Sequence, residues 1–410
     1  MTTISAEFTF VPLEPLFSES AAEDCRACVV IPACNEEGSL RACLEALSHQ
    51  QNLSGGALPS AAYEVLLLLN NCTDRSRQVA EAVQQARPAM RLSIAERHFP
   101  SRDAHAGTAR KLLMDTAWHR LRGFRDYCGA AILSTDADSI VASDWIARNL
   151  SALEAGADAV GGLIKLLPKD LAVLPPSVRR CYLRDRRYAE LIAILEDALD
   201  PQAGDPLPRH LDHFGSSLAC TRGAYAKCGG LPALPSLEDE AFVDRLRRAG
   251  LRLRHDPRVV VFTSARVQGR AAIGMAGQLR LWSELNGEHD HVVTSAAYLA
   301  HRFRTLHALR LVFTTGNINA FAALKAEDRD LVVTALEKAR TVPSFLDAVD
   351  CDALIARSFR GEPDQPIQDA IRDLSFNIKK FHLSDSSQQG NAVLRSALIG
   401  DGIPLASTQP

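Results

Sequence analysis

Two carboxylates separated by one residue, Asp136 and Asp138, directly follow the apolar run Ala130–Ser134. Hard oxygen donors suit Mg²⁺ or Mn²⁺, and this spacing lets both groups share one cation with the diphosphate of a ligand. Acidic turns are common on protein surfaces, but two like charges beside a sheet are costly without a cation. We therefore interpret Asp136 and Asp138 as a metal site.

A second acidic group, Glu238-Asp239-Glu240, opens a predicted helix whose apolar residues recur at helical spacing. Acids at this position favour the helix dipole, which is the purely structural interpretation. The functional interpretation makes Asp239 a general base that removes a proton from an attacking hydroxyl. Spacing alone leaves the two interpretations equal.

Basic residues follow the predicted strand 259–262, with Arg266 and Arg270 near Gly269. A glycine beside arginines can approach a diphosphate closely, and the guanidinium groups can neutralise charge on a leaving group. Some arginines in such a segment are ordinary solvated surface groups. Arg266 and Arg270 are therefore candidates for contact with a diphosphate.

The elements that must position these residues alternate between strand and helix. Predicted strands are the apolar runs 27–31, 63–69, 90–95, 130–134 and 159–164. Such alternation implies right-handed crossovers and a mainly parallel sheet with helices on both faces. Ligands of these α/β sheets bind beyond the carboxyl ends of the strands. Polar clusters lie at those ends, at 32–37, 70–74 and 135–138.

The length of 410 residues favours more than one domain. Strands are expected to stop after about residue 290, and the segments beyond it have helical patterns. We expect an N-terminal extension (1–24), an α/β catalytic domain (25–289), a helical C-terminal region (290–385) and a flexible tail (386–410).

Composition excludes several classes of protein. Hydrophobic residues make up 47% and charged residues 23%, as in ordinary globular domains, and a net charge of −3 gives no overall attraction to nucleic acid. The N-terminus lacks the pattern of a secretory signal, and no apolar stretch reaches the roughly 18 residues of a membrane span. We expect a cytoplasmic protein without an integral membrane segment.

Ten cysteines are scattered along the chain, and Cys25-x-x-Cys28 is the one close pair. The pair could be a redox site or half of a zinc site, but no second CxxC or CxxH follows. We interpret the cysteines as buried thiols of a reducing compartment.

Several blocks together resemble one family. The segment 29–37, VVIPACNEE, resembles the opening strand and loop of family 2 glycosyltransferases. In that family's order follow 69–74 (LNNCTD), the basic helix start 107–110, the DxD motif 136–138 and the ED motif 238–239. The resemblance covers about residues 27 to 270, and five ordered blocks are far more specific than any one of them.

The resemblance implies a GT-A type nucleotide-diphospho-sugar transferase fold and a metal-assisted, inverting glycosyltransferase. Such an enzyme moves a hexosyl or N-acetylhexosaminyl group from a nucleotide-diphosphate sugar to a hydroxyl of a small or peripheral acceptor, with Mn²⁺ or Mg²⁺. By resemblance, Asp239 is the catalytic base, and Asp136 and Asp138 hold the metal. The donor-binding residues implied are Pro32, Ala33, Asn35, Glu36, Asn71, Arg110, Asp136, Arg266 and Arg270.

The chain departs from the family pattern at three places. Asn71 stands where many members carry an aspartate that contacts the nucleotide base. Its amide can accept a hydrogen bond but also donates one, so the resemblance favours uracil over guanine, and hence a UDP-sugar, only weakly. Thr263 or Ser264 stands where many carry a histidine metal ligand, which predicts weaker metal binding. The segment 278–282, QLRLW, resembles the QxxRW of processive synthases but has the wrong spacing. We therefore expect a non-processive enzyme.

Two other functions fit parts of the pattern. A sugar-nucleotide nucleotidyltransferase shares the architecture, but it usually opens with a glycine-rich basic loop, which residues 32–35 lack. A catalytically silent binding or scaffold protein could keep the fold and use the C-terminal helices for contact, including homo-oligomerisation. Clustered carboxylates have no physical purpose in a silent site, so glycosyl transfer is the preferred hypothesis.

Overall fold

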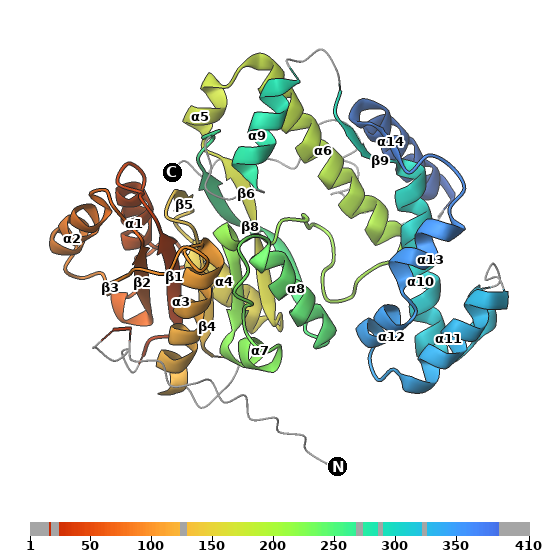
Figure 1. The fold of residues 1–410 in the computed structure, drawn as a ribbon, viewed down its shortest axis with the longest axis horizontal. Helices are drawn as coiled ribbons and strands as arrows, with labels where there is room; N and C mark the ends of the chain where they lie inside the picture. Colours follow the sequence, from red (N-terminus) through yellow and green to blue (C-terminus); the bar gives the residue numbers. More distant parts are fainter. Residues whose placement is uncertain are drawn as a thin grey trace. The chain divides into compact units, whose positions relative to one another are not determined.

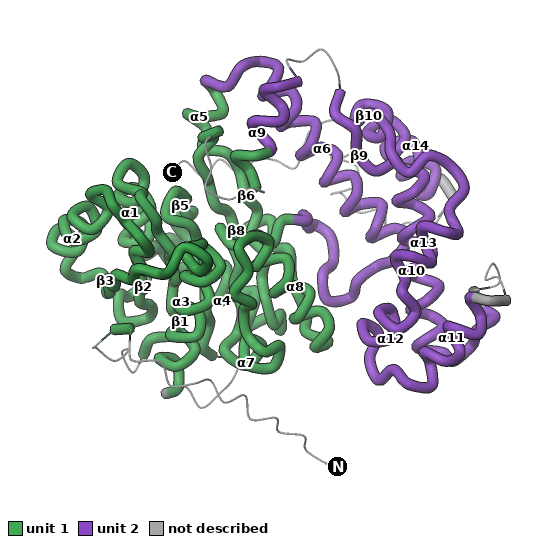
Figure 2. The backbone as a smooth tube through the Cα atoms, viewed as in Figure 1, with its two compact units in different colours: residues 1–172, 212–277, 410 green, residues 173–211, 278–409 purple. Residues whose placement is uncertain are grey.

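The computed structural model describes residues 16–17, 24–123, 129–267, 274–285, 290–321 and 326–384. The chain divides into two units (Figure 2): unit 1 comprises residues 1–172 and 212–277, and unit 2 comprises residues 173–211 and 278–409. The predicted N-terminal extension and C-terminal tail lie almost wholly outside the described residues.

Unit 1 is built on one eight-stranded sheet (Figure 1), with the strand order β3-β2-β1-β4-β7-β6-β8-β5. The strands are β1 (Ala27–Ala33), β2 (Tyr63–Asn70), β3 (Leu92–Arg97), β4 (Ala131–Ser134), β5 (Ser139–Val141), β6 (Ala159–Leu166), β7 (Leu218–Thr221) and β8 (Leu253–Thr263). Strands β3, β2, β1 and β4 pair in parallel, as do β6 and β8, whereas β7 and β5 pair antiparallel with their neighbours. The expected mainly parallel sheet is confirmed.

Helices cover both faces of this sheet. The helices of unit 1 are α1 (Leu40–Ser48), α2 (Ser76–Ala86), α3 (Ala106–Arg120), α4 (Trp145–Glu154), α5 (Pro168–Val173), α7 (Arg222–Lys227) and α8 (Glu238–Arg248). Successive residues of β1 face opposite layers: Val29 and Ile31 pack with α1, α2 and α4, whereas Cys28 and Val30 pack with α3, α7 and α8. Because both faces are covered, β1 and β2 are buried along their whole length.

Unit 2 is mainly helical. Its elements are α6 (Pro176–Leu199), most of α9 (Met275–Glu284), β9 (Val292–Thr294), α10 (Ala296–Thr315), α11 (Ala326–Lys338), α12 (Val342–Ala348), α13 (Cys351–Ser358), β10 (Asp364–Pro366) and α14 (Ile367–Ser384). One apolar core joins α6, α10 and α14, and a second joins α10 to α11, α12 and α13.

Two sequence expectations differ from the structure in this unit. Strands do not stop at residue 290, since β9 and β10 form a short antiparallel pair. The catalytic domain expected at 25–289 includes the segment 173–211, which groups with unit 2 because Leu191, Ile194 and Leu195 of α6 pack against α10 and α14. Within the described part of the chain, no helix has the length and apolar character of a membrane span.

Candidate functional site

The carboxyl ends of the parallel strands place the candidate residues of unit 1 along one side of the sheet. Glu36 follows β1, Asp136 and Asp138 follow β4, and Arg266 follows β8. Because β7 runs antiparallel to β4, its first residues lie at the same end, and Ser134 pairs with Leu218. The short 3₁₀ turn Gly215–Ser217 just before β7 therefore reaches the DxD motif.

Arg110 of α3 is the buried centre of this group, with a side chain only 4% exposed. It donates to Asp136 Oδ1 at 2.7 Å, to the Gly215 carbonyl at 2.9 Å and to Glu238 Oε1 at 3.2 Å. It also donates to the Ser134 hydroxyl. Burial opposes the charged guanidinium, but the carboxylates of Asp136 and Glu238 outweigh it and raise the pKa of Arg110. Arg110 therefore stays a cation.

Asp239 is joined to the same network. Its Oδ2 accepts the Gly215 backbone N–H at 2.7 Å, and its Oδ1 accepts the Glu240 N–H at 2.9 Å. Gly215 thus bridges Asp239 to Arg110, which in turn holds Asp136. A Cβ atom at residue 215 would lie 2.6 Å from Arg110 Cζ, so this bridge requires glycine. Asp239 therefore lies in one hydrogen-bonded network with the DxD motif, beyond its place at the start of α8.

Arg266 forms a second bridge, between the loop after β1 and the DxD motif. Its guanidinium donates to both oxygens of Glu36 at 2.9 Å and lies 2.9 Å from Asp138 Oδ2. The same oxygen accepts the Ser264 hydroxyl at 3.2 Å. Arg266 thus supplies positive charge between two carboxylates at the place where a divalent cation is expected.

The site carries an excess of negative charge. Five carboxylates and two guanidinium groups meet here: Glu36, Asp136, Asp138, Glu238 and Asp239 with Arg110 and Arg266. Burial and then the neighbouring Asp136 raise the pKa of Asp138 to about 6. A cation would lower this repulsion, so the donor set fits Mg²⁺ or Mn²⁺.

Protein ligands to such a cation are sparse. Among the described residues, no group that includes Asp136 or Asp138 brings three ligand atoms within 4.8 Å of one another. Ser264, at the position where a histidine ligand was considered, instead donates its hydroxyl to Asp138. Two acidic side chains alone would leave coordination positions of a cation open to phosphate oxygens and water.

The two predicted nucleotide-binding asparagines both have left-handed backbones, with φ of 53°. The amide oxygen of Asn35 accepts the Thr73 N–H at 2.7 Å and joins the loops after β1 and β2. Asn71 pairs with the backbone of Phe99, donating to its carbonyl at 2.9 Å and accepting its N–H at 3.0 Å. Both amides therefore fix loops at the carboxyl ends of β1 and β2, and the Asn71 amide pairs with protein backbone.

Three more residues were predicted to bind the nucleotide sugar, and the structure describes two of them. Pro32 and Ala33 belong to β1 and are buried at its carboxyl end. Arg270 lies outside the described residues.

A histidine pair next to Glu240 could not be identified from the sequence. His213 Nε2 lies 3.0 Å from Glu240 Oε2, and His213 Nδ1 lies 3.0 Å from His255 Nε2. The hydrogen bond with His213 is the main cause of a lowered pKa of Glu240. No motif contains His213, because its partners are 27 and 42 residues away in the sequence.

Several solved structures are similar to this chain. The mannosyltransferase PcManGT from Pyrobaculum calidifontis, in complex with GDP-Man and Mn²⁺, is 14% identical over 93% of this chain and 88% of that chain, with a TM-score of 0.43. Staphylococcus aureus TarS 1–349 with UDP-GlcNAc is 14% identical over 88% and 92%, with a TM-score of 0.44. Glucosyl-3-phosphoglycerate synthase from Mycobacterium tuberculosis, with Mn²⁺, UDP and phosphoglyceric acid, is 18% identical over 66% and 83%, with a TM-score of 0.35.

Sequence comparison finds one family model that matches part of the chain. No curated protein matches the chain. Residues 28–191 match the model of glycosyl transferase family 2, and this segment contains β1 to β6, the DxD motif and Arg110. By this match, the segment 28–191 is similar to glycosyl transferase family 2.

Proposed function

We propose that the protein transfers a hexosyl or N-acetylhexosaminyl group from a nucleotide-diphosphate sugar to a hydroxyl of a small or peripheral acceptor, with inversion and with help from a divalent cation. The observation that carries this proposal is the hydrogen-bonded path from Asp239 through Gly215 and Arg110 to Asp136. This path holds a carboxylate base at a fixed place relative to the acidic pair that would hold the donor.

Asp136 and Asp138 are the proposed cation ligands, and the cation would neutralise charge on the departing nucleoside diphosphate. Arg266 is the proposed second positive charge beside the diphosphate. It already bonds Asp138 and Glu36, so it lies next to the proposed donor site before any ligand binds.

Asp239 is the proposed base. Its two oxygens each accept one backbone N–H, which orients the carboxylate and leaves further lone pairs on both oxygens. One of these can accept the proton of an acceptor hydroxyl as that oxygen attacks the sugar carbon. A single displacement of this kind inverts the configuration at that carbon.

A panel of nucleotide sugars, UDP-sugars first, tests this function with Mn²⁺ and a set of hydroxyl-bearing acceptors. We expect acceptor-dependent release of nucleoside diphosphate and a product of inverted anomeric configuration by NMR. The matched control is Asp239→Asn, which keeps the size of the side chain and can accept one of the two backbone N–H groups through its amide oxygen, but cannot act as the base. Nucleotide-sugar binding without any release, across the panel, would instead favour the silent binding protein.

A further inference from the structure

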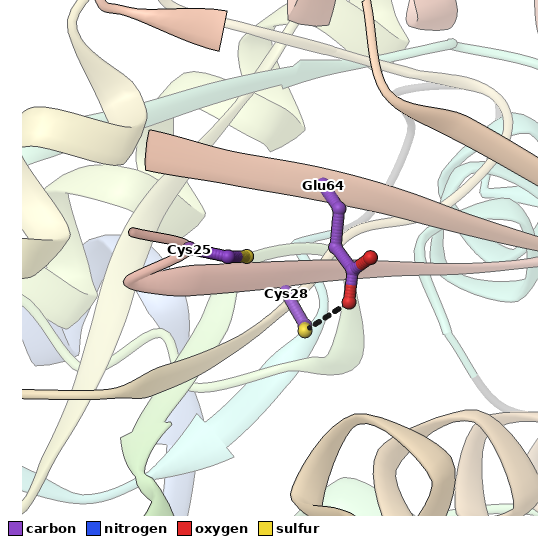
Figure 3. Close-up of side chains that lie close together, drawn as sticks. All are labelled: Cys25, Cys28 and Glu64. Atoms are coloured by element: carbon purple, nitrogen blue, oxygen red, sulfur yellow. Dashed lines mark hydrogen bonds between the residues drawn. The ribbon is translucent and has the colours of Figure 1, made fainter. Parts of the chain in front are cut away.

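A second cluster of reactive side chains lies near the amino-terminal end of β1, away from the carboxyl ends of the strands. Figure 3 shows the two thiols of Cys25 and Cys28 beside the carboxylate of Glu64. One ligand atom from each lies within 4.8 Å of the others, and all three residues are buried. Cys28 Sγ donates to Glu64 Oε1 at 2.8 Å.

The strand register brings these residues together. Cys28 of β1 pairs directly with Glu64 of β2, so their side chains leave the sheet on the same face. Cys25 lies just before β1 and packs in the same apolar core as Cys28. A sequence with a single CxxC pair therefore gains a third ligand 36 residues away, from the neighbouring strand.

Arg120, at the end of α3, holds the carboxylate from its other side. Its guanidinium donates to Glu64 Oε1 at 2.7 Å and to Oε2 at 2.6 Å. Its side chain is 9% exposed, and that of Glu64 is 3% exposed. A carboxylate ligand that is itself hydrogen-bonded in this way is the usual arrangement around a protein metal ion.

We propose that Cys25, Cys28 and Glu64 bind a structural zinc ion. Thiolate sulfur and carboxylate oxygen are both zinc ligands, and structural zinc sites are closed to solvent. Two thiolates and one carboxylate balance the two positive charges of zinc and the one of Arg120. Binding displaces both thiol protons, which leave to solvent, so zinc replaces the S–H donor between Cys28 and Glu64.

The geometry needs only a small adjustment. Tetrahedral bonds of about 2.3 Å to sulfur and about 2.0 Å to oxygen separate those two ligand atoms by roughly 3.5 Å. Cys28 Sγ and Glu64 Oε1, now 2.8 Å apart, would therefore separate by about 0.7 Å.

This site is independent of the proposed transfer reaction. Its ligands lie at or just before the start of β1 and β2, whereas Glu36, Asp136 and Asp138 of the candidate active site follow the ends of β1 and β4. Zinc here would fasten the first residues of the sheet to the end of α3 and contribute to stability.

Metal content of the full chain, expressed in zinc-supplemented or cobalt-supplemented medium, tests the site, because the buried ligands must be loaded during folding. We expect one zinc per chain after removal of loosely bound metal, and a sulfur-to-metal charge-transfer band in the cobalt form. Both signals should be lost in Cys28→Ala. They should persist in Cys220→Ala, another buried thiol of the same core, and in Asp138→Asn, which removes a proposed donor-site ligand.

A second measurement on the unaltered protein covers the case in which Cys28→Ala fails to fold. Alkylation of Cys25 and Cys28, followed by mass spectrometry, should be at least 10-fold slower in zinc-loaded protein than in protein refolded with a chelator. Metal-free protein without a charge-transfer band, equal alkylation rates in the two forms, or a Cys25–Cys28 disulfide in freshly purified protein would each overturn the proposal.

Discussion

Arg110 gives the sharpest test of how the candidate site is held together. Arg110→Met removes a cation that serves Asp136 and Glu238 while keeping a side chain of similar length. The Glu238 side chain is only 9% exposed, so water cannot replace the lost partner easily. The variant therefore leaves a buried carboxylate without a cation.

Breaking a buried ion pair by removing one partner costs about 3–5 kcal/mol. For a cooperative unit of 150–250 residues, each kcal/mol lowers Tm by about 2–4 °C. Unit 1 is of this size, so the transition that reports on it should fall by roughly 6–20 °C. Adding Glu238→Gln should recover part of the loss, since the double variant no longer buries that charge.

Arg77 provides a matched control. It also contacts two carboxylates, Glu81 at 2.9 Å and Glu96 at 2.8 Å, but its side chain is 52% exposed. Exposed ion pairs contribute about 0–1 kcal/mol each, so the loss of both in Arg77→Met should shift Tm by at most about 8 °C and by less than Arg110→Met does. Differential scanning calorimetry of the three variants measures these shifts. Equal shifts for Arg77→Met and Arg110→Met would refute the reasoning, because burial would then have no effect.

Three further substitutions address the chemistry and the packing of the site. Asp239→Asn should lower kcat by about 10²–10⁴-fold while Kd for the nucleotide sugar stays nearly constant, and ordinary turnover would remove the assignment of the base. Gly215→Ala places Cβ 2.6 Å from Arg110 Cζ, so it should lower the free energy of unfolding by about 1–3 kcal/mol and also lower activity. Gly38→Ala, with open space around it, should leave the free energy of unfolding in urea unchanged. The hydrogen bond with His213 lowers the pKa of Glu240 below its ordinary 4.5, so this carboxylate stabilises the fold above that pH and loses the effect as pH falls through the folded value. Glu240→Gln should therefore be less stable than the parent protein at pH 6, with the difference closing below pH 4.5, and a constant difference down to acid pH would contradict the assignment.

The sheet could be predicted from sequence because its strands are continuous apolar runs. A run such as 63–69 is buried on both sides only when helices cover both faces, which the alternating helices provide. The polar residues after β1 and β4 then follow from the general position of ligands in α/β sheets. This reasoning places Glu36, Asp136 and Asp138 on one side of the sheet.

The partners of these residues could not be predicted, because they depend on contacts between distant segments. Arg110 and Gly215 are 105 residues apart, and the antiparallel course of β7 brings them together. Asn71 was expected to face a nucleotide base, but its amide pairs with Phe99 through a local loop.

The same limit applies away from the candidate active site. The segment 173–211 falls within the predicted catalytic domain 25–289, and only the packing of α6 assigns it to unit 2. Glu64 joins Cys25 and Cys28 through the register of two strands, which no local pattern encodes.

Calorimetric titration with UDP, and with GDP in parallel, tests the central claim that the acidic residues after β4 hold a cation together with a nucleoside diphosphate. One of the two nucleotides should bind with Mn²⁺, and binding should weaken at least 10-fold in excess EDTA and in Asp138→Asn. It should be unchanged in Asp144→Asn, whose carboxylate pairs with Arg148 instead. Equal affinity with and without Mn²⁺, or full binding by Asp138→Asn, would contradict the account.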